Sequence, residues 1–495
     1  MVQDIRRSAT MVVAVAAAVC STGLAGVGSA AAGTHMAAGG RAAALGGTWG
    51  TAIEVPGTAA LNQGGNAQVN SLSCASAGTC SAGGFYADSS GLHAFVAGER
   101  NGTWHAAIEV PGTAALNQGG QAVVNSVSCA SAGNCSAGGL YRDGSGHDQA
   151  FVAGERNGIW HAAKEVPGSA ALNGGGDAQI VSVSCASAGT CSAGGLYTDG
   201  SGHDQAFVAG ETNGTWHAAK EVPGTAALNK KGFAGVDSVS CASAGNCSAG
   251  GFYTGGSGLQ QAMVAGETNG TWHAAIAVPG TLALNKNGGA AVNEVSCGSA
   301  SDCSAGGTYS DVAGRIQAFI AGETNGTWHT AQEVPGTAAL NLGGNAQVNS
   351  VSCGSAGNCS AGGYYTDSAL HSQAFVAGET NGTWHTAKQV PGTAALNQGP
   401  AGAQVVSLSC ASAGNCSAGG LYTDSANHSQ VFVASETNGT WRTAIEVPGT
   451  AALNQRGDDW ISSVSCASAG NCSAGGYYAP SEFLREAFVV NETSQ

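Results

Sequence analysis

The sequence predicts an all-β fold: an eight-bladed β-propeller of four-stranded antiparallel blades, with the ring closed by the N-terminal strand pairing in the last blade. Three observations lead to this prediction. A unit of about 56 residues occurs eight times, and each copy contains two cysteines six positions apart. Each unit also holds four short strand-like segments, which is the pattern of a propeller blade. Finally, the repeats begin with an isolated fourth strand and end with a third strand that has no successor.

The copy at 177–224 shows how each strand is predicted. Four segments rich in β-branched or alternating residues are expected to be strands, at 179–185, 191–197, 205–211 and 215–222. A turn-like link of five residues joins the first two, and Thr198–Gly202 is a turn by composition. Asn213-Gly214 is the strongest short hairpin signal in the unit. Pro223 ends the fourth strand.

Residue size predicts where each strand lies in its blade. The second strand carries Ser-Ala-Gly-Gly in every copy, which suits a crowded position near the axis. The fourth strand carries Trp and accepts Ile, Lys or Gln at one position, which indicates a partly solvated outer edge. We expect the isolated strand at Thr48–Val55 to complete the blade left open at Glu486–Thr493 and so hide a sheet edge. An open β-solenoid is the alternative, but it would not require complementary ends.

The paired cysteines are predicted to form eight disulfides within the repeats. Structural zinc sites favour two to four intervening residues and need two converging pairs or added histidines. Here five residues intervene, and each pair lies a whole repeat from the next. Each bridge closes a short loop and is expected to stabilise the fold by roughly 2 kcal/mol. The pairs are Cys74 and Cys80, Cys129 and Cys135, Cys185 and Cys191, Cys241 and Cys247, Cys297 and Cys303, Cys353 and Cys359, Cys410 and Cys416, and Cys466 and Cys472.

The first residues are predicted to direct export. Residues 1–32 combine a basic head, a short apolar run and small residues near a cleavage site, which is typical of a signal peptide. A flexible linker is expected at 33–46 and the propeller at 47–495. A membrane anchor is the competing interpretation, but the apolar run is short. A lipoprotein anchor at Cys20 is another, but the residues before it make a poor lipobox. We therefore expect a secreted protein with no membrane span after signal removal.

Composition narrows the classes of partner. Only 9% of the residues are charged, and the net charge of −15 is spread over the repeats without a basic patch. Nucleic-acid binding by phosphate neutralisation is therefore not expected. Regular Val, Trp, Phe and Tyr positions argue against the disorder that a Gly- and Ser-rich composition would otherwise suggest. We expect a monomer that needs no cofactor and binds no metal.

Gly210–Trp216 reads Gly-Glu-Thr-Asn-Gly-Thr-Trp and resembles the Asp-box of sialidase-like and related propellers, Ser-x-Asp-x-Gly-x-Thr-Trp. The chain departs from that motif at Ala209, Glu211 and Asn213. The whole unit also looks like the repeat of secreted actinobacterial propeller proteins of unassigned function, over nearly everything after residue 46. The resemblance implies a propeller whose Asp-boxes are structural and lie on the face away from an active site.

No catalytic constellation is visible in the sequence, so we expect no enzyme activity. A site like that of sialidases would need three arginines around a carboxylate, a Tyr nucleophile with its Glu, and an acid. Arg100 and Arg156 instead occupy repeat positions beside the Asn-Gly turn, on the Asp-box side. Glutamates at the Asp-box position, such as Glu211, are expected to accept hydrogen bonds from turn amides. The spacing of the other acids gives no support for a glycosidase pair.

Candidate ligand-binding residues lie on the opposite face, in the loop between the second and third strands. A Tyr beside an Asp can stack on a sugar ring and accept its hydroxyl hydrogens. The alternative is that the Tyr packs at a strand end and the Asp caps a turn. The candidates are Tyr141, Asp143, Tyr197, Asp199, Tyr365, Asp367, Tyr422 and Asp424.

Two functional hypotheses follow. The first is a secreted, non-catalytic propeller that binds glycan or protein ligands through several equivalent loops, with avidity. The second is a secreted hydrolase or lyase that acts on polysaccharide at a single central site. Near-identity of the repeats favours the first, because one catalytic centre would make some blades differ from the others.

Overall fold

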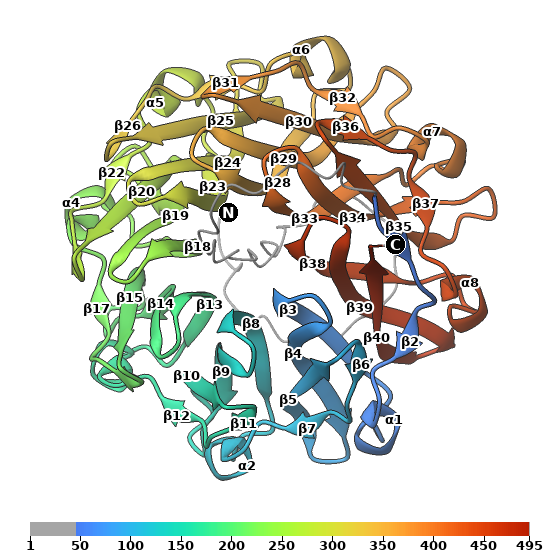
Figure 1. Cartoon of the computed structure of the whole chain (residues 1–495). Helices are drawn as coiled ribbons and strands as arrows, with labels where there is room; N and C mark the ends of the chain where they lie inside the picture. Colours follow the sequence, from blue (N-terminus) through green and yellow to red (C-terminus); the bar gives the residue numbers. More distant parts are fainter. Residues whose placement is uncertain (1–45, 495) are drawn as a thin grey trace, which may run out of the picture.

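The computed structural model describes residues 46–494. They form a closed ring of eight antiparallel sheets around a central opening, with the short helices on the outer rim (Figure 1). The predicted eight-bladed, all-β propeller is confirmed. The predicted signal peptide at 1–32 lies outside the described residues, as does the predicted linker apart from Gly46.

Each blade has three long strands, and its outermost strand is split into two pieces of two residues. The innermost strands are β3 (Gln68–Ser76), β8 (Ala122–Ser131), β13 (Ala178–Ser187), β18 (Ala234–Ser243), β23 (Ala291–Ser299), β28 (Ala346–Ser355), β33 (Gln404–Ser412) and β38 (Trp460–Ser468). The second strands are β4 (Thr79–Asp88), β9 (Asn134–Arg142), β14 (Thr190–Thr198), β19 (Asn246–Thr254), β24 (Asp302–Ser310), β29 (Asn358–Thr366), β34 (Asn415–Thr423) and β39 (Asn471–Ser481). The third strands are β5 (Gly91–Arg100), β10 (Asp148–Arg156), β15 (Asp204–Thr212), β20 (Gln260–Thr268), β25 (Ile316–Thr324), β30 (Ser372–Thr380), β35 (Ser429–Thr437) and β40 (Leu484–Thr493).

The outer strand pieces and one short helix follow in each repeat. The pieces are β1 (Thr48–Trp49) and β2 (Ile53–Glu54), β6 (Thr103–Trp104) and β7 (Ile108–Glu109), β11 (Ile159–Trp160) and β12 (Lys164–Glu165), β16 (Thr215–Trp216) and β17 (Lys220–Glu221), β21 (Thr271–Trp272) and β22 (Ile276–Ala277), β26 (Thr327–Trp328) and β27 (Gln332–Glu333), β31 (Thr383–Trp384) and β32 (Lys388–Gln389), and β36 (Thr440–Trp441) and β37 (Ile445–Glu446). The helices are α1 (Thr58–Leu61), α2 (Thr113–Leu116), α3 (Ser169–Leu172), α4 (Thr225–Leu228), α5 (Thr281–Leu284), α6 (Thr337–Leu340), α7 (Thr393–Leu396) and α8 (Thr450–Leu453). We number the blades one to eight from β3 to β38.

The eighth blade is completed by the start of the described chain, as predicted. β1 pairs antiparallel with β40, placing Trp49 opposite Glu492, and β2 pairs with the same strand, placing Glu54 opposite Phe488. Trp49 is buried, and its indole Nε1 donates to Ser435 Oγ of the seventh blade at 3.2 Å. The first and last strands therefore share one sheet, and the ring has no open edge at the seam.

The predicted continuous fourth strand at 215–222 is wrong, because its middle residues bond to the neighbouring blade. The Ala219 amide donates to the Pro167 carbonyl at 2.7 Å instead of pairing within its own sheet. The same Ala-to-Pro bond joins every pair of neighbouring blades, including Ala52 to Pro448 across the seam. The loop predicted after Pro223 contains the short helix α4, which the sequence analysis did not anticipate.

The core lies between blades rather than inside any one of them. Ala206 and Val208 on β15 of the third blade pack with Val236 and Val239 on β18 of the fourth. A Cβ on Gly194 would come within 2.5 Å of Val236, which explains the glycine in the second strand. Since each sheet buries its residues against the next, one repeat alone would leave its apolar face in water.

The eight predicted disulfides are all present. Their S–S distances run from 2.03 to 2.09 Å, and each joins the first strand of a blade to the second. Serine side chains then join the blades near the centre: Ser182 Oγ accepts from the Val239 amide at 3.0 Å, and Ser184 Oγ accepts from the Cys241 amide at 2.9 Å. The disulfides indicate an oxidising environment. No helix among residues 46–494 is long and apolar enough to cross a membrane.

Candidate functional site

The links between strands gather on two opposite faces. On what we call the loop face, the link between second and third strands meets the link to the next blade, and the Asp204 amide donates to the Gly232 carbonyl at 3.0 Å. On what we call the turn face, the Asn-Gly turn meets the disulfide hairpin, and the Gly214 amide donates to the Gly189 carbonyl at 2.8 Å. The candidate loops therefore lie on the face opposite the Asn-Gly turns, as predicted.

The Asn-Gly turn has the geometry that its sequence predicts. Asn213 has φ of 49° and Gly214 has φ of 76°. Positive φ at both central residues belongs to a type I′ turn, which matches the twist of the flanking strands. Arg156 lies over this turn from the preceding blade, and its Nη2 lies 3.3 Å from Glu211 Oε1. The placement of this arginine on the turn face agrees with the prediction.

The glutamates of the turn face do not accept turn amides, contrary to our expectation. Glu211 is 4% exposed, and its Oε2 accepts a hydrogen bond from Ser136 of the preceding blade at 3.2 Å. Burial raises the pKa of Glu211, while Ser136 and Arg156 act in the opposite direction. Six further glutamates accept from a serine of the preceding blade: Glu155, Glu267, Glu323, Glu379, Glu436 and Glu492. They hold blades together and are not available to a ligand.

The four candidate tyrosines are buried at strand ends. Their exposed fractions are between 3% and 5%. Tyr141 donates its hydroxyl to Glu165 Oε2 at 3.0 Å, and Tyr422 donates to Glu446 Oε2 at the same distance. Burial, followed by the charge of Glu221, raises the pKa of Tyr197 to about 12. Tyr365 is buried in the same way, and stacking on a sugar would require any of these rings to leave the core.

The four candidate aspartates cap the loop between second and third strands. Asp143 Oδ1 accepts from the Ser145 amide at 2.8 Å and the His147 amide at 3.0 Å, and Oδ2 accepts from Gln149 at 3.1 Å. Burial acts to raise the pKa of Asp143, but these hydrogen bonds outweigh it and lower the pKa. Equivalent bonds to a backbone amide and a Gln side chain hold Asp199, Asp367 and Asp424.

These aspartates remain partly accessible, and a histidine lies beside each of them. The side chain of Asp199 is 29% exposed and that of His203 is 50% exposed, with Nδ1 and Oδ2 at 3.7 Å. Gln205 joins the aspartate to Asn229, whose Nδ2 donates to Gln205 Oε1 at 2.9 Å. Hydrogen bonds from Gln205 and Asn229 thus hold the loop in place, while the Asp199 carboxylate and the His203 imidazole reach solvent. The geometry agrees with the packing and capping interpretation, and ligand binding by the eight candidates stays a prediction.

Sequence analysis missed the histidines, although the signal is visible. A histidine follows the capping aspartate by four residues in four copies, at His147, His203, His371 and His428. The aspartate and the histidine lie in the same loop, so the pair occurs wherever the repeat keeps both residues. The tyrosine two residues before the aspartate lies at a strand end and turns inward.

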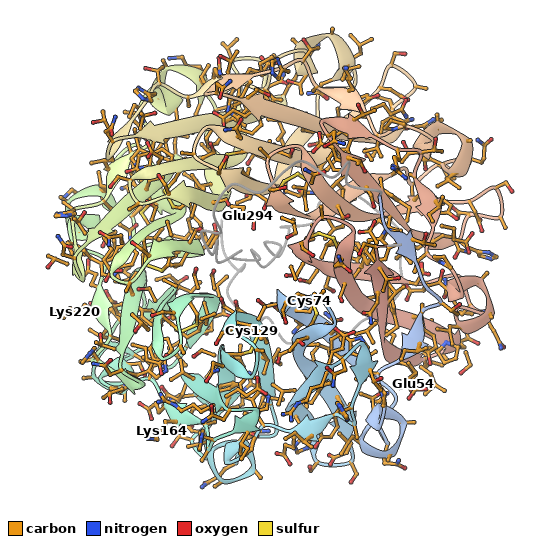
Figure 2. All side chains as sticks on the ribbon, in the orientation of Figure 1. Glu54, Cys74, Cys129, Lys164, Lys220 and Glu294 are labelled. Atoms are coloured by element: carbon orange, nitrogen blue, oxygen red, sulfur yellow. A yellow bond between two sulfur atoms is a disulfide. The ribbon has the colours of Figure 1, made fainter. Side chains whose placement is uncertain are left out.

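Two acids at the inner strands break the repeat. Glu294 stands where the other blades have Ser, and its Oε2 accepts from the Val351 amide at 2.9 Å. Asp237 stands where other blades have Asn, Val or Ser. Burial raises the pKa of each to about 8. Figure 2 shows Glu294 at the inner edge of the ring, while Lys164 and Lys220 lie at the outer rim.

A third single-copy acid lies in the core. Asp459 is fully buried where the other seven blades have Ala. Neither carboxylate oxygen has a hydrogen-bond partner of good geometry among the described residues. Asn454 comes close, but its Nδ2 already donates to the Ser429 carbonyl at 3.1 Å and to Gln430 Oε1 at 3.3 Å. Burial, then the charges of Glu446 and Asp458, raise the pKa of Asp459 well above its usual range.

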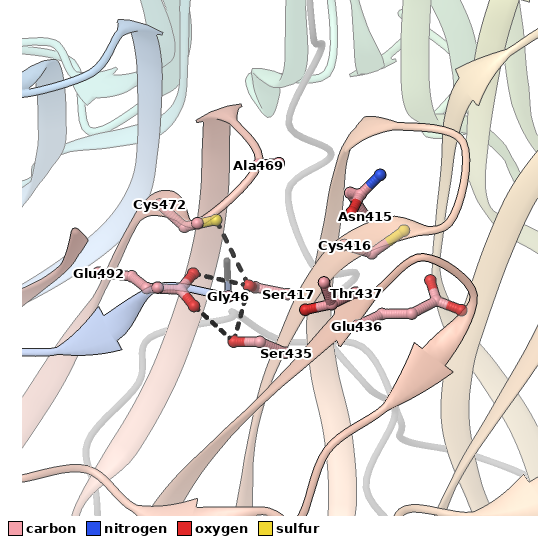
Figure 3. A pocket seen from close by; sticks show the side chains of 12 residues that line it. Gly46, Asn415, Cys416, Ser417, Ser435, Glu436, Thr437, Ala469, Cys472 and Glu492 are labelled. Carbon is pink, nitrogen blue, oxygen red and sulfur yellow. Dashed lines mark hydrogen bonds between the residues drawn. The ribbon is translucent and has the colours of Figure 1, made fainter. Parts of the chain in front are cut away.

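Two small hollows lie between neighbouring blades of the described chain. A cavity of about 10 Å³ on the turn face lies between the seventh and eighth blades, where Glu492 accepts from Ser417 at 2.9 Å and Ser435 at 2.7 Å (Figure 3). That is room for about one water molecule. A groove of about 250 Å³ at the seam is lined by Ile53, Trp104 and neighbouring residues, and Gly50 there replaces the His or Arg of other blades. Within residues 46–494, no three His, Cys, Asp or Glu side chains are placed to hold a metal ion.

No known family profile and no curated protein sequence matches this chain. Solved structures with a similar fold include Sqt1 of Chaetomium thermophilum bound to the N-terminus of ribosomal protein L10, at 10% identity, covering 88% of this chain and 98% of that one, with a TM-score of 0.49. The BP39L lectin of Burkholderia pseudomallei is 12% identical, with 77% and 99% coverage and a TM-score of 0.41. The microbial sialidase Hz136 is 12% identical, with 81% and 73% coverage and a TM-score of 0.32. The chain is an eight-bladed propeller with such proteins among its structural neighbours.

Proposed function

We propose that this protein is a secreted, non-catalytic propeller that binds glycan or protein ligands through the loop face. The observation that supports the proposal is the repeated Asp–His pair of that face. In the third blade it combines a half-exposed imidazole with a partly exposed carboxylate on a loop held by Gln205 and Asn229. A carboxylate accepts hydroxyl hydrogens, and an imidazole either donates or accepts, so the pair suits adjacent hydroxyls of a sugar.

Repetition gives the pair its functional value. The second, third and seventh blades hold it with similar geometry, since His and Asp lie 3.9, 3.7 and 3.5 Å apart. One such surface pair binds weakly, but several on one rigid ring gain avidity for a ligand that displays many copies of the same group. The loops are already ordered by hydrogen bonds, which lowers the entropic cost of binding.

A glycan array followed by titration tests the proposal. We expect more than one binding site per chain, and a decrease in stoichiometry as His147, His203 and His428 are changed to Gln one after another. His217→Gln on the outer rim is the matched control and leaves the stoichiometry unchanged. A single site, or an unchanged stoichiometry in the triple variant, contradicts the multivalent proposal.

The second candidate function is a polysaccharide hydrolase or lyase with one central site. The observation that favours it is the asymmetry of Asp237 and Glu294, because a raised pKa suits a general acid. Glu294→Ser restores the residue of the sister blades and therefore spares the fold. Turnover of a polysaccharide by the native protein that is lost in this variant would support the enzyme, whereas equal turnover in both would exclude Glu294 as its acid.

A further inference from the structure

The link between the third and fourth blades differs from the other seven. It carries Lys230, Lys231 and Phe233 on the loop face, and all three are exposed. The position of Phe233 holds a polar or small residue in every other link: Asn66, Gln121, Asp177, Gly289, Asn345, Gly402 and Asp458. No other link carries two lysines in succession. This link is therefore a single-copy feature on a repeated surface.

Phe233 presents an aromatic surface to solvent. It is 42% exposed. Its ring is held by Phe252 of the fourth blade, with ring centroids 4.8 Å apart and planes inclined by 39°. An aromatic ring that packs on one side and is exposed to solvent on the other can stack on a flat apolar surface.

The lysines lie beside a loop that lacks the aspartate and the histidine found in other blades. The second-to-third loop of the fourth blade has Gly255 where six blades have Asp, and Leu259 where four have His. The Lys231 amide donates to the Thr254 carbonyl at 3.2 Å, and a Cβ on Gly256 would lie 4.0 Å from Lys230 Cγ. On the side of the fourth blade the lysines therefore border a loop without a carboxylate, while Asp204 of the third blade adjoins the link at Phe233.

Three arginines near the loop face are paired with acids, whereas Lys230 and Lys231 are not paired within the described part of the chain; Lys286 of the next link is also unpaired there but stands alone. Arg142 lies 2.8 Å from Asp148, Arg456 lies 3.1 Å from Glu482, and Arg485 lies 2.8 Å from Asp458. The side-chain Nζ of Lys230 donates to the Ala226 carbonyl at 3.3 Å, and within residues 46–494 neither lysine has an acidic group within 4.0 Å. On a chain of net charge −15, Lys230 and Lys231 are two adjacent positive charges without an acidic partner among the described residues.

We propose that Lys230, Lys231 and Phe233 form a binding site for an acidic polysaccharide, whose sugar ring stacks on Phe233 while its carboxylate or sulfate groups bind the lysines. A sugar ring needs one exposed aromatic face and no pocket, and none of the cavities described above lies at this link. The charge of an acidic peptide would also attract the lysines, but it gives the exposed ring of Phe233 no partner. The inference rests on the proposed function and names a ligand class for one blade of the loop face.

Titration with soluble polymers tests this site. The probes are polygalacturonate for carboxylate, dextran sulfate for sulfate, and unmodified dextran as the neutral polymer. Lys230→Gln with Lys231→Gln should weaken binding of the preferred polyanion about tenfold, because an exposed ion pair is worth roughly three- to fivefold in affinity and two are removed. Phe233→Asn, the residue found in two sister links, should weaken it several-fold. Both variants carry residues tolerated at or near these positions in other repeats, so they should fold.

The matched control removes the same charge elsewhere. Lys164→Gln with Lys220→Gln at the outer rim should change affinity less than about twofold, since general charge effects are screened by salt. If the control variant loses as much affinity for the polyanion as the test variant, the site is overturned. Failure of the native protein to bind either polyanion also overturns it. Tighter binding of poly-glutamate that ignores Phe233→Asn overturns it in favour of a protein partner. The two proposals can fail separately. If His147→Gln and His428→Gln leave polyanion binding unchanged while the lysine substitutions abolish it, this site is supported even if the multivalent proposal fails.

Discussion

The buried carboxyl of Asp459 predicts a substitution that stabilises the protein. Asp459→Ala restores the residue present in the seven sister blades, all of which are buried there. A buried polar group without a hydrogen bond costs about 1–3 kcal/mol. We therefore expect Asp459→Ala to raise the free energy of unfolding by about 1–3 kcal/mol near neutral pH.

The sign of the pH dependence follows from the raised pKa. The folded protein holds the Asp459 proton more tightly than the unfolded chain, so this contribution to stability is complete below the unfolded pKa of about 4. It is lost as the pH rises toward the folded pKa. The advantage of Asp459→Ala should accordingly be largest at about pH 7 and smallest at about pH 4.

Denaturant unfolding at both pH values measures the effect. Asp459→Asn keeps the shape but carries no charge, so it should lose the pH dependence without the full gain in stability. The reciprocal change Ala403→Asp places a carboxyl at the same position of the seventh blade and should destabilise it. An Asp459→Ala protein that unfolds more easily than the native one at neutral pH, or whose difference is the same at both pH values, refutes the reasoning.

Three further predictions follow from the ring. Replacing Cys185 and Cys191 by Ala should cost roughly 2 kcal/mol, and mass spectrometry of the native protein should find eight linkages confined to single repeats. Removing the chain up to Glu54 takes away β1 and β2, so the melting temperature should fall and the exposed edge of β40 should promote aggregation, as seen by light scattering. Burial raises the pKa of Glu379, so Glu379→Gln should raise the free energy of unfolding by on the order of 1 kcal/mol at neutral pH and leave it unchanged at acidic pH. Glu211→Gln should raise it by less, because this variant also loses the ion pair with Arg156. Equal increases in the two variants would contradict the role of the ion pair.

The number of blades, three of the four strands in each, the disulfides and the closing strand were all predicted correctly from the sequence. All of these features except the closing strand depend on residues close together in the chain. Alternation of side chains, Asn-Gly at a hairpin and two cysteines six apart are complete signals within one repeat. Even ring closure is visible as a fourth strand supplied before the first blade.

Packing between the blades determines which of these residues reach the surface. Glu211 bonds to Ser136 and Ala219 to Pro167, across a boundary between blades that no local pattern describes. The inward turn of Tyr197 follows from packing at the blade interface, and it leaves the neighbouring Asp199 and its histidine at the surface. The bonding partners of these side chains lie in a neighbouring blade, about one repeat away in the chain. Which side chains are buried is therefore fixed only when the blades pack against one another in the closed ring.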